Sequence, residues 1–107
     1  MLFELRQYPI KPGQREKLVK LMDEVIIPYQ ISKGMVVIAS FVSEQEDENL
    51  YVWIRRFENE EVRKQLYASV YENDFWQKEI SPQIGELIDR SGIKVTRLNP
   101  TPNSVIR

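Results

Sequence analysis

The spacing of the apolar positions changes along the chain and divides it into elements. Residues 2–10 alternate loosely and are rich in β-formers, and the pair Pro12-Gly13 ends this run, which predicts a strand. Over residues 18–29 the apolar side chains recur every three or four positions, which predicts a helix with one apolar face. Pro28 lies late in this pattern, so we expect the helix to kink there or to end near residue 31.

Two further apolar runs, at 35–42 and 50–57, are joined by the acidic segment 43–49. Their β-branched and aromatic content predicts the two strands of a hairpin. Carboxylates of the acidic segment could collect a divalent cation, but they lack the spacing of a calcium-binding loop. We therefore expect a solvated turn, because runs of like charge at a hairpin tip usually stay in water.

The last third of the chain predicts helical segments and then a strand. Asn59 can cap a helix that begins at Glu60, where acidic side chains favour the positive end of the helix. The pair Asn73-Asp74 can start a second helical segment, in which Pro82 removes one backbone hydrogen bond. Residues 93–98 alternate as a final strand.

The predicted order is β-α-β-β-α-β, which is typical of a ferredoxin-like α+β fold with a four-stranded antiparallel sheet and helices on one face. At 107 residues the chain has the size of one domain. We place this domain at 1–99 and a C-terminal tail at 100–107, where Pro100 and Pro102 interrupt strand pairing.

The hairpin strands are apolar in both registers, although one layer of helices covers only one face of a sheet. We expect a second copy of the chain to cover the other face, giving a homodimer of the dimeric α/β-barrel kind. The alternative is that loops or the C-terminal tail cover this face within one chain. On the first hairpin strand we expect Met35, Val37, Ala39 and Phe41 on one face and Val36, Ile38 and Val42 on the other.

Composition excludes several classes of function. Fifteen basic and sixteen acidic residues give a net charge of −1, which argues against nucleic acid as a partner. Cysteine and histidine are both absent, so we expect no metal site and no cofactor. Charged residues begin at Glu4 and Arg6, and no apolar stretch is long enough for a membrane span, which favours a cytoplasmic protein.

The string Phe-Glu-Leu-Arg-Gln-Tyr-Pro-Ile-Lys-Pro-Gly at 3–13 resembles the start of NIPSNAP-family domains, which begin with an E-L-R-x-Y strand and a P-G turn. The likeness continues at Pro28, Gly34, Trp53, Arg63 and Asp74-Phe75-Trp76, although a second glycine soon after Gly34 is lacking. The resemblance implies the fold of dimeric α/β-barrel proteins, a group with cofactor-free oxygenases, haem-degrading enzymes and ligand-binding stress proteins. It implies a homodimer and no particular reaction.

Aromatic and arginine side chains on the first and third strands, and on the helices that face them, form the candidate site. These strands are neighbours in the split order, so their side chains can meet if the registers match. Aromatic rings would form the walls of a pocket, and an arginine would bind a carboxylate or enolate oxygen. The alternatives are a ladder in which the arginines pair with Glu4 or Glu58, and a core position for Trp76. The candidate pocket residues are Arg6, Tyr8, Tyr51, Trp53, Arg55, Arg63, Tyr67 and Trp76.

Three functions are compatible with this pattern. The first is a homodimeric module that binds a small apolar or anionic organic molecule. The second is a cofactor-free oxygenase or isomerase in which an arginine and a tyrosine stabilise an enolate-like anion. The third is a structural interaction domain. Without histidine the base of an enzyme would have to be a tyrosine or a carboxylate, and Glu4 beside Arg6 is the carboxylate that matters most.

Overall fold

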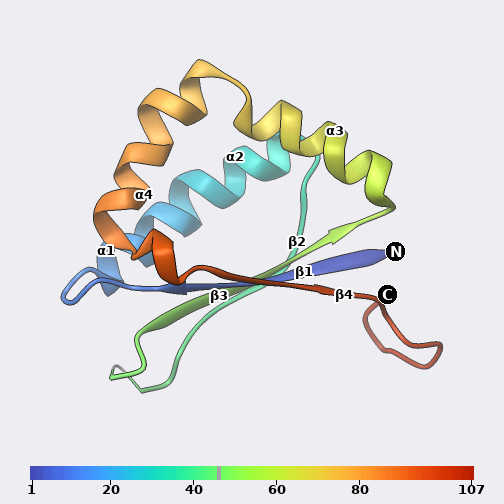
Figure 1. The fold of residues 1–107 in the computed structure, drawn as a ribbon, viewed down its shortest axis with the longest axis horizontal. Coiled ribbons are helices and arrows are strands. Elements are labelled where there is room, and N and C mark those ends of the chain that lie inside the picture. The colour runs from blue at the N-terminus through green and yellow to red at the C-terminus, as the bar shows by residue number, and fades with distance from the viewer. Residues whose placement is uncertain (46) are drawn as a thin grey trace.

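The computed structural model describes residues 1–45 and 47–107, and in them a four-stranded antiparallel sheet lies under a layer of helices (Figure 1). The strand order is β2-β3-β1-β4. This confirms the predicted fold and places the first and third strands side by side. Glu46, within the acidic segment where we considered a cation, lies outside the described residues.

The strands are β1 (Leu2–Pro9), β2 (Val36–Val42), β3 (Leu50–Phe57) and β4 (Lys94–Leu98). The pairing of β1 with β3 sets Glu4 opposite Arg55, Arg6 opposite Trp53, and Tyr8 opposite Tyr51. Residues that face each other across antiparallel strands point to the same side of the sheet. These six side chains therefore share the face that the helices cover.

From the sequence we also expected Leu50, Val52 and Ile54 on one face of β3 and Tyr51, Trp53 and Phe57 on the other, which is correct, whereas the faces expected for β2 are partly wrong. A bulge between Val37 and Ala39 inserts an extra residue into β2, and the alternation changes face there. As a result Ala39 and Phe41 pair with Ile54 and Val52 on the open face, whereas Val37 pairs with Arg55 beneath the helices. The two-residue period could not reveal this bulge, because the residues on both sides of it are apolar.

The first helix is continuous through Pro28 and contains a π turn. It consists of α1 (Arg15–Leu21), the π segment η1 (Met22–Ile26) and α2 (Ile27–Ser32). Pro28 occupies the second position of α2, and the wide turn before it accommodates its missing N–H. The predicted end near residue 31 is confirmed. Gly34 then reverses the chain with a φ of +102°, a conformation that favours glycine.

The second helical region has the same construction. It consists of α3 (Glu60–Tyr71), the π segment η2 (Phe75–Ile80), α4 (Ser81–Leu87) and the short 3₁₀ helix η3 (Arg90–Gly92). Asn59 accepts a hydrogen bond of 2.8 Å from the N–H of Val62, which confirms the predicted cap. Pro82 follows a π segment just as Pro28 does. None of the helices in the described residues is long and apolar enough to cross a membrane.

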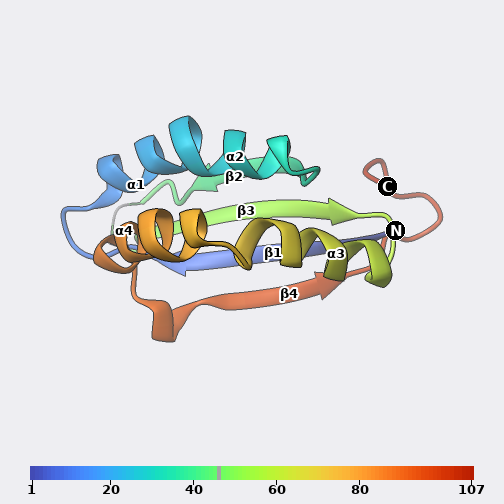
Figure 2. The same ribbon diagram turned by 90° about the horizontal axis from the view of Figure 1, so that it is seen from above.

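The two helical rows run along the strands, and β4 lies at an edge of the sheet that no helix covers (Figure 2). The core fills the space between the rows and the sheet, with Leu18, Met22, Ile26, Ile80 and Ile84 from the helices packed on Tyr8 and Trp53. Side chains from both helical rows thus meet above β1 and β3.

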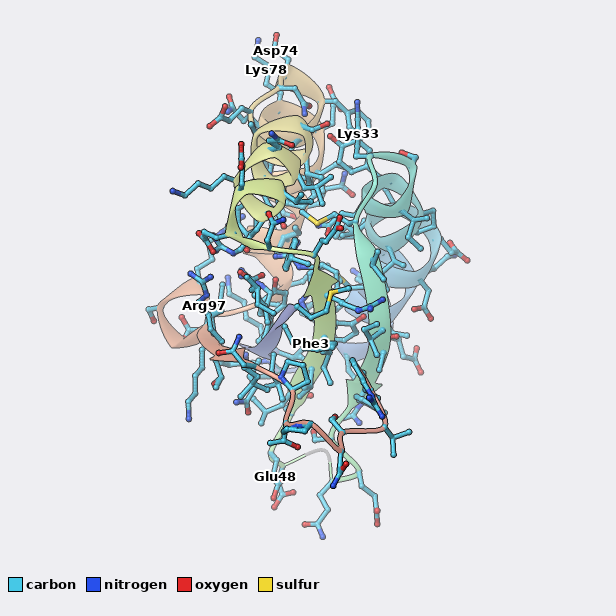
Figure 3. All side chains as sticks on the ribbon, turned by 90° about the vertical axis from the view of Figure 1, so that its right-hand side faces the viewer. Phe3, Lys33, Glu48, Asp74, Lys78 and Arg97 are labelled. Atoms are coloured by element: carbon cyan, nitrogen blue, oxygen red, sulfur yellow. The ribbon has the colours of Figure 1, made fainter. Side chains whose placement is uncertain are left out.

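The opposite face of the sheet is only partly covered. After β4 the C-terminal tail turns back against the open face of the sheet (Figure 3). There Pro100 and Ile106 line a groove together with Phe3. Phe3 is 5% exposed, whereas Val36 and Phe41 at the other side of this face are 45% and 56% exposed. The tail therefore covers one part of the face and leaves an apolar part in water.

Candidate functional site

A cavity of about 270 Å³ lies between the two helical rows, above β1 and β3. Its floor comes from the sheet, one wall from the first helix and the other from the second helical region. The volume is just below the range of roughly 300–1,000 Å³ that is usual for ligand pockets. The lining residues are Arg6, Tyr8, Met22, Ile26, Gln30, Trp53, Tyr67, Tyr71, Trp76, Ile84, Ile88, Arg90 and Ile93.

The structure brings together five of the eight candidate residues at this cavity, namely Arg6, Tyr8, Trp53, Tyr67 and Trp76. The sheet supplies Arg6, Tyr8 and Trp53 because every second side chain of β1 and β3 points towards the helices. Tyr51 stacks on Tyr8 with ring centroids 6.3 Å apart and is buried beneath the cavity. Arg55 and Arg63 lie behind its wall.

Aromatic rings make up much of the cavity wall. The rings of Tyr8 and Trp53 meet edge to face at 6.3 Å, and those of Tyr71 and Trp76 do so at 4.7 Å. Trp76 also packs on Tyr29, with ring centroids 6.1 Å apart. It is therefore part of the packed interior as well as of the cavity wall, so the two interpretations of Trp76 are compatible.

Arg6 is the positive group of the cavity floor. Its Nε donates to the hydroxyl of Tyr8 over 3.0 Å, and its nearest carboxylate oxygen in the described residues, Oε1 of Glu4, is 3.9 Å away. Burial alone would lower the pKa of Arg6, but the adjacent hydroxyl of Tyr8 raises it above its usual value. With a side chain 18% exposed, the guanidinium is charged and has no close counterion of its own.

Glu4 is fully buried and bound on both of its oxygens. Its Oε1 accepts a hydrogen bond of 2.8 Å from Arg55, its Oε2 one of 2.7 Å from Arg63, and the hydroxyl of Tyr67 lies within 2.8 Å of both. Burial alone would raise the pKa of Glu4, but these donors and charges outweigh it and lower the pKa. Glu4 is thus an ionised counterion for two arginines.

Arg55 is also fully buried and is held by polar groups from both helical rows. Its Nη1 donates to Gln30 over 2.9 Å and to the hydroxyl of Tyr71 over 2.6 Å, and its Nη2 donates to Glu4 and Tyr67. For Arg55 and Arg63 the predicted alternative, ion pairing with Glu4, is what the structure contains. Arg6 remains as the arginine of the cavity floor.

Sequence reasoning missed Gln30 and did not select Tyr71. Gln30 is a polar residue in the apolar stripe of the first helix, four positions after Ile26. A buried glutamine on such a stripe signals a polar partner in the interior, and the partners are Arg55 and Tyr71. Tyr71 follows Tyr67 by four positions, the spacing that places two side chains on one helix face.

The hydroxyls near the cavity are not poised to act as bases. Burial raises the pKa of Tyr67 to about 12 and also raises that of Tyr71. Both hydroxyls therefore stay protonated at neutral pH. The arrangement offers fixed donors, a guanidinium and aromatic surface, which suits binding and the stabilisation of negative charge.

Comparison with known families and structures identifies close relatives of this architecture. A family model described as NIPSNAP matches residues 3–104 of the chain. A crystal structure of a NIPSNAP family protein from Agrobacterium tumefaciens is 25% identical and superposes with a TM-score of 0.86, covering 99% of this chain and 98% of the other. No curated protein matches the sequence.

Two more distant structures share the fold. An uncharacterized NIPSNAP domain protein from Burkholderia xenovorans is 19% identical, with a TM-score of 0.81 and coverage of 96% of this chain and 97% of the other. The crystal structure of an antibiotic biosynthesis monooxygenase is 18% identical, with a TM-score of 0.66 and coverage of 95% and 100%. At these identities the similarity concerns the fold alone.

Proposed function

Because this chain belongs to the NIPSNAP family and contains a cavity walled by aromatic rings, we propose that it is a homodimeric module that binds a small, mostly apolar organic anion. The ligand would lie among the rings of Trp53, Trp76 and Tyr71 with its carboxylate or enolate oxygen on Arg6. The proposal does not depend on a reaction.

The observation that carries the proposal is the position of Arg6. A guanidinium without a close carboxylate partner is exceptional beside Arg55 and Arg63, both of which are bound directly to Glu4. Charges in the interior are usually paired closely, so a guanidinium in the cavity floor whose nearest carboxylate oxygen in the described residues is 3.9 Å away is a place for an anion. Arg63 also pairs with Glu60 at 3.3 Å, so Arg6 is the arginine of this group whose charge is least neutralised.

Trp53 supports the same proposal. Its side chain lines the cavity and is 1% exposed, and its indole Nε1 has no hydrogen-bond partner among the described residues. A buried N–H without a partner costs about 1–3 kcal/mol, so the described residues leave one donor unused beside the cavity.

A cofactor-free oxygenase or isomerase is the second candidate. Arg6 could stabilise an enolate, and the fold is shared with a protein described as an antibiotic biosynthesis monooxygenase, but the hydroxyl proton of Tyr67 is donated to Glu4. Proton abstraction is the difficulty, because the buried carboxylate beside the cavity, Glu4, has its oxygens bound by Arg55, Arg63 and Tyr67. This favours binding over catalysis, and the open cavity favours binding over a purely structural domain.

The tryptophans provide a direct assay, because the chain has two and both line the cavity. We expect benzoate to change the tryptophan fluorescence in a saturable way, and its neutral isostere benzamide to bind far more weakly. Loss of one charge-assisted hydrogen bond is worth about 1.5–3 kcal/mol, so Arg6→Gln should weaken benzoate binding roughly 10- to 100-fold. Arg107→Gln in the tail is the matched control and should bind as the unaltered chain does.

The proposal is contradicted if binding depends neither on the charge of the ligand nor on the charge of Arg6. If benzoate and benzamide bind equally well, or if Arg6→Gln and Arg107→Gln give the same affinity for benzoate, Arg6 is not an anion-binding residue. Circular dichroism of each variant separates loss of binding from loss of folding.

A further inference from the structure

The cavity has a second guanidinium at its mouth. Arg90 is the one exposed residue among those that line the cavity, whereas Arg6 is part of its floor. In the described residues Arg90 makes no ion pair, so its charge is not neutralised within the chain. Two positive groups thus lie at different depths of one small cavity.

The position of Arg90 is defined by the start of α4. Its Nη2 donates to the backbone carbonyl of Ser81 and, over 2.9 Å, to the hydroxyl of the same residue. The side chain lies against Gly85, where an added Cβ would come within 3.2 Å of Nε. The absence of a side chain at Gly85 therefore leaves room for the guanidinium of Arg90 beside α4.

The backbone keeps the two arginines apart. The N–H of Asp89, next to Arg90, donates to the carbonyl of Pro9 over 2.9 Å, and Pro9 is three residues along β1 from Arg6. Three residues of a strand span roughly 10 Å. The rings of Trp53, Trp76 and Tyr71 lie in the cavity that both guanidiniums line.

We propose that the ligand of this cavity carries anionic groups at both ends of an aromatic or apolar body, with one bound by Arg6 at the floor and the other by Arg90 at the mouth. This inference rests on the proposed binding function and narrows its ligand class from organic anions to dicarboxylates. Arg90 is then the residue that selects a dianion over a monoanion.

Three probes separate the number of charges from their placement. Benzoate carries one negative charge. Benzene-1,4-dicarboxylate carries two, one at each end of the ring, whereas phenyl phosphate carries close to two at the same end. Tryptophan fluorescence at constant ionic strength measures all three, since exposed charges are screened by salt. We expect the 1,4-dicarboxylate to bind at least about tenfold more tightly than benzoate.

Variants of Arg90 test its role directly. Arg90→Gln should reduce the affinity for the 1,4-dicarboxylate to that for benzoate, while benzoate and phenyl phosphate binding stay within about twofold. Arg90→Lys should restore part of the loss. Gly85→Ala, which displaces the guanidinium without removing its charge, should weaken the 1,4-dicarboxylate alone. Arg6→Gln should weaken all three probes.

Each result decides between the two proposals. If benzoate binding depends on Arg6 but the 1,4-dicarboxylate binds no more tightly, or Arg90→Gln weakens all probes equally, the dianion inference is wrong and the binding function stands. If none of the probes changes the fluorescence, both are wrong. Unchanged thermal unfolding of Arg90→Gln excludes a folding defect as the cause of any loss.

Discussion

Glu4 is the residue on which the polar interior of this protein depends. It is fully buried, and it neutralises Arg55 and Arg63 directly at 2.8 Å and 2.7 Å. Removal of one partner of a buried ion pair is costly because the other charge remains without compensation. The same pairing determines the chemistry of the cavity, since it leaves Arg6 as the guanidinium of the cavity floor without a close carboxylate partner.

Glu4→Gln should lower the free energy of unfolding at pH 7 by about 3–5 kcal/mol, because it leaves Arg55 buried without a counterion. The pKa of Glu4 is lowered in the folded state. Its contribution to stability is therefore complete above the unfolded-state pKa of about 4.3 and is lost as the pH falls through the folded-state value. Urea denaturation between pH 7 and pH 3 measures this loss, which should be smaller in the variant.

Glu58→Gln is the control for this measurement, because Glu58 is exposed at the end of β3 and makes no ion pair in the described residues. It should leave both the stability at pH 7 and the acid dependence unchanged. Parallel pH profiles for the unaltered chain and Glu4→Gln would contradict the assigned role of Glu4.

At the scale of residues, the sequence predicted which side chains lie at the cavity better than it predicted which interactions they make. Alternation and the split strand order were enough to place Arg6, Tyr8 and Trp53 on one face. The pairing register was not predictable, and it is the register that sets Arg55 opposite Glu4 and makes it part of an ion pair. A shift by two residues would have left the faces unchanged and the pairs different.

At the scale of elements, the two helical regions accommodate an internal proline in the same way. Each has a proline at the second position of an α-helix, directly after a π segment. From the sequence we predicted that both prolines lie within helical regions and that the first helix ends near residue 31. The sequence did not predict the π turns, because apolar residues three and four positions apart fit either kind of helix.

The cap at Asn59 allows the stability of α3 to be tested. Its side chain holds the N–H of Val62, so Asn59→Ala should lower the free energy of unfolding by about 1 kcal/mol. Urea denaturation should show a lower midpoint with an unchanged slope. Asn59→Asp keeps the acceptor and should be close to the unaltered chain; equal losses for both substitutions would show that the cap contributes nothing.

At the scale of the whole molecule, the open face of the sheet is the feature that one chain does not complete. The C-terminal tail covers Phe3, but Val36, Phe41 and Leu98 are 45%, 56% and 42% exposed. Both predicted coverings of this face remain relevant, because the tail occupies one part and the rest is apolar surface of the kind that a second subunit buries. The sequence indicated apolarity on both faces without showing how the tail and a partner would share the open one.

We expect a homodimer at micromolar concentration, and Phe41→Asp should shift it towards the monomer by placing a charge in the apolar surface. Sedimentation equilibrium measures the shift. Lys94→Asp, a charge change on the same face near the sheet edge, is the comparison and should affect association less. A compact monomer of the unaltered chain at this concentration would contradict the dimer.

The π turns have a consequence for the phase of the helices. The inward residues Leu18, Met22, Ile26 and Gln30 recur every four positions, and so do Trp76, Ile80, Ile84 and Ile88. In a regular helix of 3.6 residues per turn, a four-residue repeat rotates by about 40° at each step and would carry its fourth member about 120° round the axis. The wide π turns cancel this rotation and keep the fourth residue on the inward face. The hydrogen bond between Arg55 and Gln30 therefore depends on the π segment η1, which precedes Gln30 in the chain.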